Sequence, residues 1–279
     1  MDNDTEAYIL LLLSDGNLPT GSFVASAGLE SYVAHGFAAS IPALDSTTNY
    51  IRDSLSSYAR SALPFVHDSH DTVSRLVGCK DPYNHLDSTL DQLKVLDDLY
   101  ESMTLNHVAR RASKTQGVAL LTLYSKGFSK PHLRHSDAHT EDHRGAVFSK
   151  LVDRFKLLIR RGETPGHLPV CWAVLTAALS LSRERTRFLH LFLHARSLLS
   201  ASVRLNTVGP YAAQQLLLHA VRPLVQEEAS KCQALTTGIL DSSNDSKVDD
   251  TVDGPAVTWP LGEILAARHD LQHSRIFNS

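Results

Sequence analysis

The sequence predicts an all-α protein of about ten helices, and three observations support this prediction. Between residues 210 and 226, apolar side chains recur at spacings of three and four, as on one face of an amphipathic helix. Between residues 186 and 205 they occupy nearly every face, which is typical of a helix packed on all sides. Alanine and leucine outnumber β-branched residues in the apolar segments, and no long stretch alternates apolar with polar residues. We therefore expect a single compact helical domain.

The individual helices follow from apolar periodicity and from proline and glycine breaks. Gly209 and Pro210 mark one such break and the start of the next helix. Proline is tolerated in a first helical turn, because its missing N–H would have no partner there. In chain order, the expected helices span residues 22–35, 42–60, 64–77, 91–106, 107–124, 148–160, 168–182, 186–205, 210–226 and 259–272.

Two polar stretches interrupt this pattern. Residues 130–145 are rich in histidine, and residues 241–254 place five aspartates among Ser, Asn and Gly with almost nothing to bury. The second stretch is expected to be a disordered acidic linker. The chain then divides into a helical domain (1–240), the linker (241–254) and a C-terminal segment (255–279). The apolar residues of that segment could dock on the helical domain or on another protein.

Composition and charge exclude several classes of protein. The 279 residues are 43% hydrophobic and 20% charged, so wholesale disorder is excluded. Lysine and arginine number 27 against 30 acidic residues, a net charge of -3, which gives no global positive field for nucleic acid or an anionic membrane. The longest uncharged stretch, 164–182, has too few apolar residues for the ~20 that a membrane span needs. Three widely separated cysteines and an acidic N-terminus favour a cytoplasmic location.

Histidine is the most chemically suggestive component, with 15 residues. The densest cluster consists of His132, His135, His139 and His143. If that segment were helical, steps of three and four would align the imidazoles on one face, which suits nickel or zinc. A solvated polar loop is the competing interpretation, because histidine clusters without a framework seldom hold a metal tightly. We therefore assign no firm metal site and no tightly bound cofactor.

A second metal hypothesis uses pairs of histidine and aspartate. All-α metal-dependent phosphohydrolases use a distant His, a His-Asp pair and a later Asp, and four residues follow that order: His35, His67, Asp68 and Asp97. The match is loose, since such pairs arise by chance in a chain rich in both residue types. His190 and His194 lie one turn apart in a very apolar segment and are interpreted as core or interface residues. A phosphohydrolase is thus the alternative to a non-enzymatic function.

A more specific indication comes from four segments and the end of the chain. Residues 10–30 read LLLLSDGNLPTGSFVASAGLE, and residues 110–121 read RRASKTQGVALL. GHLPVCWAV at 166–174 precedes LLSASVRLNTVGPYAAQQLL at 198–217, and the chain ends in ARHDLQHSRIFNS. In this order and at these separations, the set resembles the UreF family of urease accessory proteins. Members carry an LPxGxF...S.GLE opening, an R..S..QG.AL segment, a SA.VRL..VGP..AQ.LL helix pair and a terminal H[DE]....R.F.S tail.

The resemblance implies an all-helical, dimeric protein without catalysis of its own. In the family picture, UreF joins the accessory protein UreD (also called UreH) to UreG, a nickel-carrying GTPase, and the complex activates apo-urease. Nickel released on GTP hydrolysis is thought to move through the complex, and UreF has been proposed to regulate the GTPase. The expected function is therefore that of a chaperone and adaptor with nickel as a transient cargo.

Several residues of the matching motifs are expected to shape the backbone. Pro19 fixes φ and Gly21 permits unusual backbone angles, so residues 18–21 should form a tight turn, with Ser22 able to cap the next helix. Arg204 falls in an otherwise apolar run, so we expect a carboxylate or a helix-end carbonyl beside it. The remaining residues of this structural set are Gln116, Gly117, Gly209 and Pro210.

Three features are expected to contact partners: Glu30, a basic patch and the end of the chain. Glu30, on the helix after the opening turn, could accept an ion pair or contact hydrated metal in a passage. A basic patch on consecutive turns of one helix could steer an acidic partner surface; it consists of Arg110, Arg111 and Lys114.

The end of the chain is the third of these features. Arg275, Ile276 and Phe277 combine a forked donor with two apolar anchors, the residue types that dominate interface energetics. We expect this tail to be free in the isolated chain and to become ordered on a partner, at a cost in entropy that apolar burial must exceed.

Overall fold

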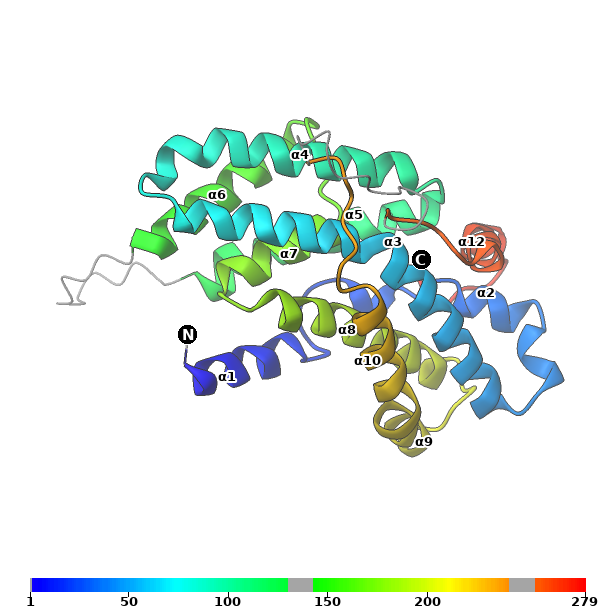
Figure 1. Ribbon diagram of the computed structural model, residues 1–279. Coiled ribbons are helices and arrows are strands. Elements are labelled where there is room, and N and C mark those ends of the chain that lie inside the picture. The colour runs from blue at the N-terminus through cyan, green and yellow to red at the C-terminus, as the bar shows by residue number, and fades with distance from the viewer. Residues whose placement is uncertain (1, 130–142, 241–253) are drawn as a thin grey trace.

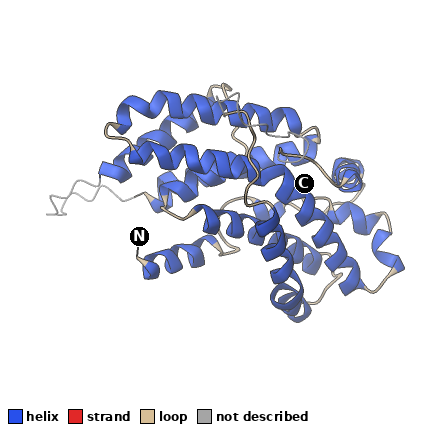
Figure 2. Ribbon diagram, in the orientation of Figure 1, coloured by secondary structure: helices blue, strands red, loops and turns tan. Residues whose placement is uncertain are grey.

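One 36-residue helix, α3 (Ala43–Gly78), runs through the middle of the fold (Figure 1). In this computed structural model, which describes residues 2–129, 143–240 and 254–279, helices α4, α7, α8 and α10 all pack against α3, and α5 packs against α7. The described residues contain helices and loops but no strand (Figure 2), so the all-α prediction is confirmed. Their apolar side chains form one continuous core.

The helices have the following bounds: α1 (Asn3–Leu13), α2 (Leu29–Ala34), α3 (Ala43–Gly78), α4 (Leu86–Met103), α5 (His107–Leu123), α6 (His143–Arg160), α7 (Leu168–Ala178), α8 (Arg183–Arg204), α9 (Pro210–Gln215), α10 (Arg222–Lys231) and α12 (Pro260–Ala267). Short 3-10 turns occupy Ser22–Val24, Phe37–Ser40, Pro82–His85 and Arg268–Leu271, and π-helical turns occupy Tyr124–Phe128 and Leu216–Val221. None of the helices in the described part of the chain is both long and apolar enough to cross a membrane.

Helix α3 continues through Pro64, where the sequence predicts a break between two helices. A proline inside a helix cannot donate to the carbonyl four residues earlier, here that of Arg60. The Ala256 N–H, from the C-terminal segment, donates to this carbonyl instead, with an N···O distance of 3.4 Å. A contact from the far end of the chain therefore replaces the hydrogen bond that Pro64 removes.

Several helix ends are shifted by a few residues, and three other segments differ from the prediction in more than their ends. Helix α1 was not expected, because its apolar side chains do not lie on one buried face: Tyr8 and Leu11 are exposed. The helix expected at 22–35 is interrupted by positive φ at Ala27 (47°) and Gly28 (86°). The helix expected at 210–226 widens into a π-helical turn before α10, whose first turn contains a proline that has no N–H to donate.

The C-terminal segment is docked on the helical domain, the first of the two possibilities left open by the sequence. Helix α12 contacts α2 and α5, and Figure 1 shows it beside α2. Leu265 and Phe277 are both buried. The expectation of a tail that is free in the isolated chain therefore does not match the structure. The linker prediction for 241–254 lies outside the described residues except for Gly254.

Candidate functional site

The opening motif forms the tight turn that its Pro19 and Gly21 predict. The Thr20 N–H donates to the Leu18 carbonyl (2.7 Å), and Gly21 has a φ of 77°, in the left-handed region that favours glycine. Ser22 does not cap a helix, because the element that follows is only a 3-10 turn; its hydroxyl lies 3.2 Å from that of Thr20 instead. The capping role predicted for Ser22 is wrong.

Gly28 lets α12 approach the opening motif closely. A Cβ at Gly28 would lie 2.8 Å from the Tyr50 hydroxyl and 3.2 Å from the backbone nitrogen of Ala266 in α12. The Tyr50 hydroxyl also donates to the carbonyl of Ala27 (2.7 Å). The glycine of the GLE sequence therefore has a packing role, since a larger residue would displace α12.

Glu30 binds the tail of its own chain, which we define as residues 268–279. The carboxylate is 5% exposed and accepts hydrogen bonds from the backbone N–H groups of Ile276 (2.6 Å) and Phe277 (3.3 Å). The buried ring of His269 lies 3.6 Å from Glu30 and 3.2 Å from the Phe277 carbonyl oxygen. Glu30 is expected to contact a partner; here its contacts come from the tail of its own chain, and a contact with a separate protein stays a prediction.

Arg204 lies against two aromatic rings from opposite ends of the chain. Its guanidinium carbon is 3.9 Å from the ring centre of Phe23 and 4.1 Å from that of Phe277, both within the range of cation–π attraction. Its Nε also donates to the carbonyl of Ser200 in the last turn of α8 (3.4 Å), the kind of partner that the sequence predicts. We call Phe23, Arg204 and Phe277 the clamp. Phe277, expected to anchor a separate protein, is buried within this one.

Asp270 joins the tail to the predicted basic patch. Arg111 donates two parallel hydrogen bonds to its carboxylate (3.0 Å each), Arg275 donates a third (2.9 Å), and His107 lies 3.2 Å away. The hydrogen bonds from Arg111 lower the pKa of Asp270 to about 2, and the positive charge of Arg275 acts in the same direction. Arg111 also donates to the Asn278 carbonyl (3.1 Å).

Glu101 neutralises the other two basic residues. Its carboxylate contacts Lys114 (2.8 Å), Arg110 (3.5 Å) and the buried ring of His167 (2.6 Å). Burial works to raise the pKa of Glu101, but the hydrogen bonds from Lys114 and His167 outweigh it and lower the pKa. The basic residues thus have carboxylate partners inside the chain, and their role in partner binding stays a prediction.

Gly117 and the Gly209-Pro210 pair have structural roles. A Cβ at Gly117 would lie 2.2 Å from the Gly166 carbonyl oxygen, so α5 meets the loop before α7 at closer range than any side chain permits. That loop is held by buried Asp97, which accepts from Thr164 Oγ1 and from two backbone N–H groups at 2.6 to 2.8 Å. Gly209 precedes α9 and Pro210 opens it, as predicted.

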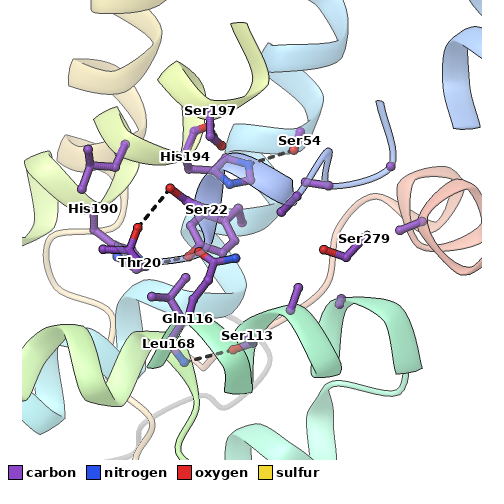
Figure 3. A pocket seen from close by; sticks show the side chains of 18 of the residues that line it. Thr20, Ser22, Ser54, Ser113, Gln116, Leu168, His190, His194, Ser197 and Ser279 are labelled. Atoms are coloured by element: carbon purple, nitrogen blue, oxygen red, sulfur yellow. Dashed lines mark hydrogen bonds between the residues drawn. The ribbon is translucent and has the colours of Figure 1, made fainter. Parts of the chain in front are cut away.

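A cavity of about 440 Å³, which we call the chamber, lies among the opening motif, α3, α5, α8 and the C-terminal segment. Hydroxyl groups, the Gln116 amide and two imidazoles face it (Figure 3). Tyr58 OH lies 2.8 Å from His190 Nε2, and Ser54 Oγ lies 3.0 Å from His194 Nε2. Burial lowers the pKa of His190 to about 3 and that of His194 to about 4, so both rings are neutral at pH 7.

The four residues of the phosphohydrolase hypothesis do not converge. His67 Nδ1 contacts the Leu235 carbonyl (2.9 Å), Asp68 accepts from the Thr237 N–H (2.8 Å), and His35 accepts from Arg268 (2.8 Å), whereas Asp97 holds the loop before α7. The described residues contain no group of three or more His, Cys, Asp or Glu side chains that could hold a metal ion. The ligand set of that hypothesis is therefore wrong.

The histidine cluster falls largely outside the described residues. His132, His135 and His139 are outside the described residues. His143 is the first residue of α6, but its side chain is not described. Sequence reasoning missed two carboxylates: Glu101, which contacts Arg110, Lys114 and His167, and Asp270, which contacts Arg111 and Arg275. Asp270 belongs to the H[DE] pair of the tail pattern, the one sequence feature that could have identified it.

This chain is similar to known proteins along nearly its whole length. The UreF family model matches residues 43–221. Urease accessory protein 6 of Cryptococcus neoformans is 40% identical, with 98% of this chain and 97% of that protein covered. The "Uncharacterized urease accessory protein UreF-like" of Schizosaccharomyces pombe is 30% identical, with 100% and 99% covered. Urease accessory protein F of Arabidopsis thaliana is 24% identical, with 96% and 90% covered. The chain therefore belongs to the UreF family of urease accessory proteins.

Proposed function

We propose that this protein is a non-catalytic adaptor of urease maturation, which joins a UreD (UreH) partner to the GTPase UreG so that nickel can enter apo-urease. It works in the cytoplasm, as a homodimer within the complex, and holds nickel only as passing cargo. The same contacts allow it to modulate GTP hydrolysis by UreG. Family membership supports this assignment, and a surface feature of the C-terminal segment supports it independently.

That feature is a set of large apolar side chains left exposed on and beside the docked segment. We call it the apolar set: Leu105, Leu261, Ile264, Leu271 and Ile276, with 40% to 82% of each residue exposed. Leu105 belongs to it because its neighbour Asn106 donates to the Glu263 carbonyl of α12 (2.9 Å). The ion pairs of Asp270 with Arg111 and Arg275 lie in the same segment. We take these side chains to form one patch, because a contiguous exposed apolar patch with polar neighbours is typical of protein-binding surfaces.

The docked tail changes how partner binding should occur. Ile276 is exposed while Phe277 is buried, so the two predicted anchors have different functions. Ile276 can contact a partner without any rearrangement, whereas Phe277 holds the tail in place. A partner that binds the docked tail avoids the entropic cost of ordering a free segment.

The test is a pair of charge substitutions on the apolar set. Ile264→Asp with Ile276→Asp should leave the fold intact by circular dichroism, because both side chains are exposed. The double variant should retain less than roughly a tenth of UreD in a pull-down, since buried charges at an interface are costly. Leu157→Asp, at an exposed position of α6, is the matched control and should bind normally.

Cells lacking the protein provide the functional measurement. Urease activity, assayed with and without excess nickel, should be restored by the wild type and by Leu157→Asp but not by the double variant. Normal UreD retention and normal activation by the double variant would contradict the proposed surface. Deleting residues 268–279 is a poorer test, because it also removes the buried Phe277 and His269.

A further inference from the structure

The ring of His269 lies between two hydrogen-bond acceptors where the tail meets α2. It belongs to the 3-10 turn Arg268–Leu271 and is 0% exposed. Its Nε2 lies 3.2 Å from the Phe277 carbonyl oxygen, within the tail. Its Nδ1 lies 3.6 Å from a carboxylate oxygen of Glu30, on α2. A single buried ring therefore faces an acceptor with each of its two nitrogens.

A neutral imidazole cannot match both acceptors, because it has one N–H donor and one lone pair. With the proton on Nε2, the ring donates to the Phe277 carbonyl, but the lone pair of Nδ1 faces the Glu30 carboxylate. With the proton on Nδ1, the lone pair of Nε2 faces the carbonyl oxygen instead. Nδ1 is a buried polar atom without a hydrogen-bond partner, which is costly for a neutral ring. Only the imidazolium has a donor at each nitrogen.

The Glu30 carboxylate also favours a charged ring. Both of its oxygens already accept N–H groups, from Ile276 and from Phe277, so a proton shared between the carboxylate and the ring belongs on the ring. A carboxylate that is 5% exposed is costly to bury alone and far less costly beside an opposite charge. Within the described part of the chain, Glu30 is the one carboxylate that pairs with this ring.

The elements around this turn carry further charged and titratable groups. They are His35 at the end of α2, Glu263 on α12, His107 and Arg111 on α5 and Arg204 on α8, and within the tail Arg268, Asp270, Arg275 and the C-terminal carboxylate. Asp270 is paired with Arg111 and Arg275, and Arg268 donates to His35. Arg204 interacts with Glu30 and, as a cation, opposes a charge on the ring, but its guanidinium lies on the aromatic rings of the clamp.

We propose that the docked tail holds a proton on His269, as an imidazolium beside Glu30, and that docking of the tail is therefore linked to pH. In the released tail the ring is solvated, and a solvated histidine gives up its proton near neutral pH. Docking thus takes up a proton: it is favoured at low pH, and it weakens as the pH rises and the docked ring loses its proton. The inference concerns the isolated chain and does not depend on the adaptor function proposed above.

Nitrogen NMR of the full-length protein, isotope-labelled in its histidines, tests the protonation state directly. A ring nitrogen that carries a proton resonates far from one that does not, so an imidazolium is distinguished from both neutral tautomers. The His269 signals are assigned by their loss in His269→Gln. At about pH 7.5 they should show a proton on both nitrogens, whereas the exposed ring of His273, in the same tail, should be neutral. In Glu30→Gln, which removes the negative charge, His269 should be neutral as well.

Digestion with a carboxypeptidase measures release of the tail, because the protease needs a free chain end. The rate at which Phe277 is removed is divided, at each pH, by the rate for a free peptide of residues 268–279, so that the pH dependence of the protease cancels. Between about pH 6.5 and 8.5 this ratio should rise roughly tenfold in the wild type and less than about twofold in His269→Gln. His273→Gln is the matched control and should behave as the wild type.

Three results would overturn the proposal. A neutral His269 ring in the wild type, at a pH where His273 is neutral, would mean that docking takes up no proton there. An imidazolium that persists in Glu30→Gln would mean that the carboxylate does not hold the proton. A pH dependence that survives in His269→Gln would mean that another group controls docking. If His269→Gln does not fold, the proposal still fails when no histidine of the wild type is an imidazolium at about pH 7.5.

Discussion

Replacing Gly117 with alanine should destabilise the protein strongly, although alanine is the better helix former. The new Cβ would lie 2.2 Å from the Gly166 carbonyl oxygen and 2.9 Å from the His167 carbonyl carbon, where ordinary contact begins at 3.4 Å. Neither neighbour is a flexible side chain, and Asp97 holds both residues through their N–H groups. Overpacking of this kind costs about 3 kcal/mol, whereas the helix propensity of alanine returns only about 1 kcal/mol. The net loss should be about 2 kcal/mol.

Urea denaturation at pH 7 measures this loss, and a thermal melt should show a midpoint lower by about 4–8 °C. Gly78→Ala is the matched control, since Gly78 is the exposed last residue of α3 and an added Cβ would meet nothing within 4 Å. The control should be unchanged or slightly more stable. If Gly117→Ala were as stable as Gly78→Ala, the close contact between α5 and the loop before α7 would not be the reason for glycine at this position.

Three further changes should affect stability or tail docking in defined ways. Asp97→Asn should lower the free energy of unfolding by about 2–4 kcal/mol, because an amide cannot accept all three hydrogen bonds; a loss below about 0.5 kcal/mol on urea denaturation would contradict the buried network. The wild type should lose stability by roughly 4–6 kcal/mol as the pH falls from 7 to 5, because three buried histidines stay neutral in the fold but protonate near pH 6.5 when unfolded. Their folded pKa values are about 4 for His67, about 3 for His190 and about 4 for His194. A flat urea midpoint over this range would refute the assignment. Arg111→Lys should weaken tail docking by up to about 1 kcal/mol through loss of the paired hydrogen bonds to Asp270, seen as faster amide exchange at Asn278; equal exchange rates would show that the pair does not hold the tail.

The helices could be predicted because their determinants are local. Apolar spacing and the break at Gly209 and Pro210 act within a few residues of the backbone that they shape. The errors arise where a distant residue decides the outcome. Pro64 does not end α3, and the Ala256 N–H donates to the Arg60 carbonyl, to which the proline cannot donate. No pattern within residues 42–77 contains that information.

The motifs of the candidate site could be found from the sequence, but their contacts could not. Arg111 and Asp270 are 159 positions apart and form a bidentate ion pair, and Glu30 bonds a backbone N–H 246 positions away. Isolated charges in a sequence indicate a binding surface as readily as an internal ion pair. The same ambiguity makes an apolar tail look like a free anchor, although of its two predicted anchors Phe277 is buried and Ile276 is exposed.

The opening motif and the tail are best understood as two halves of one junction. Each supplies what the other lacks: Glu30 accepts the N–H groups of an extended tail that has no helical partners for them, and Phe277 covers the guanidinium of Arg204. The family motifs in these two segments therefore form, in the first place, a contact within the chain. A role in partner binding rests on the side chains that this contact leaves outside, above all Ile276.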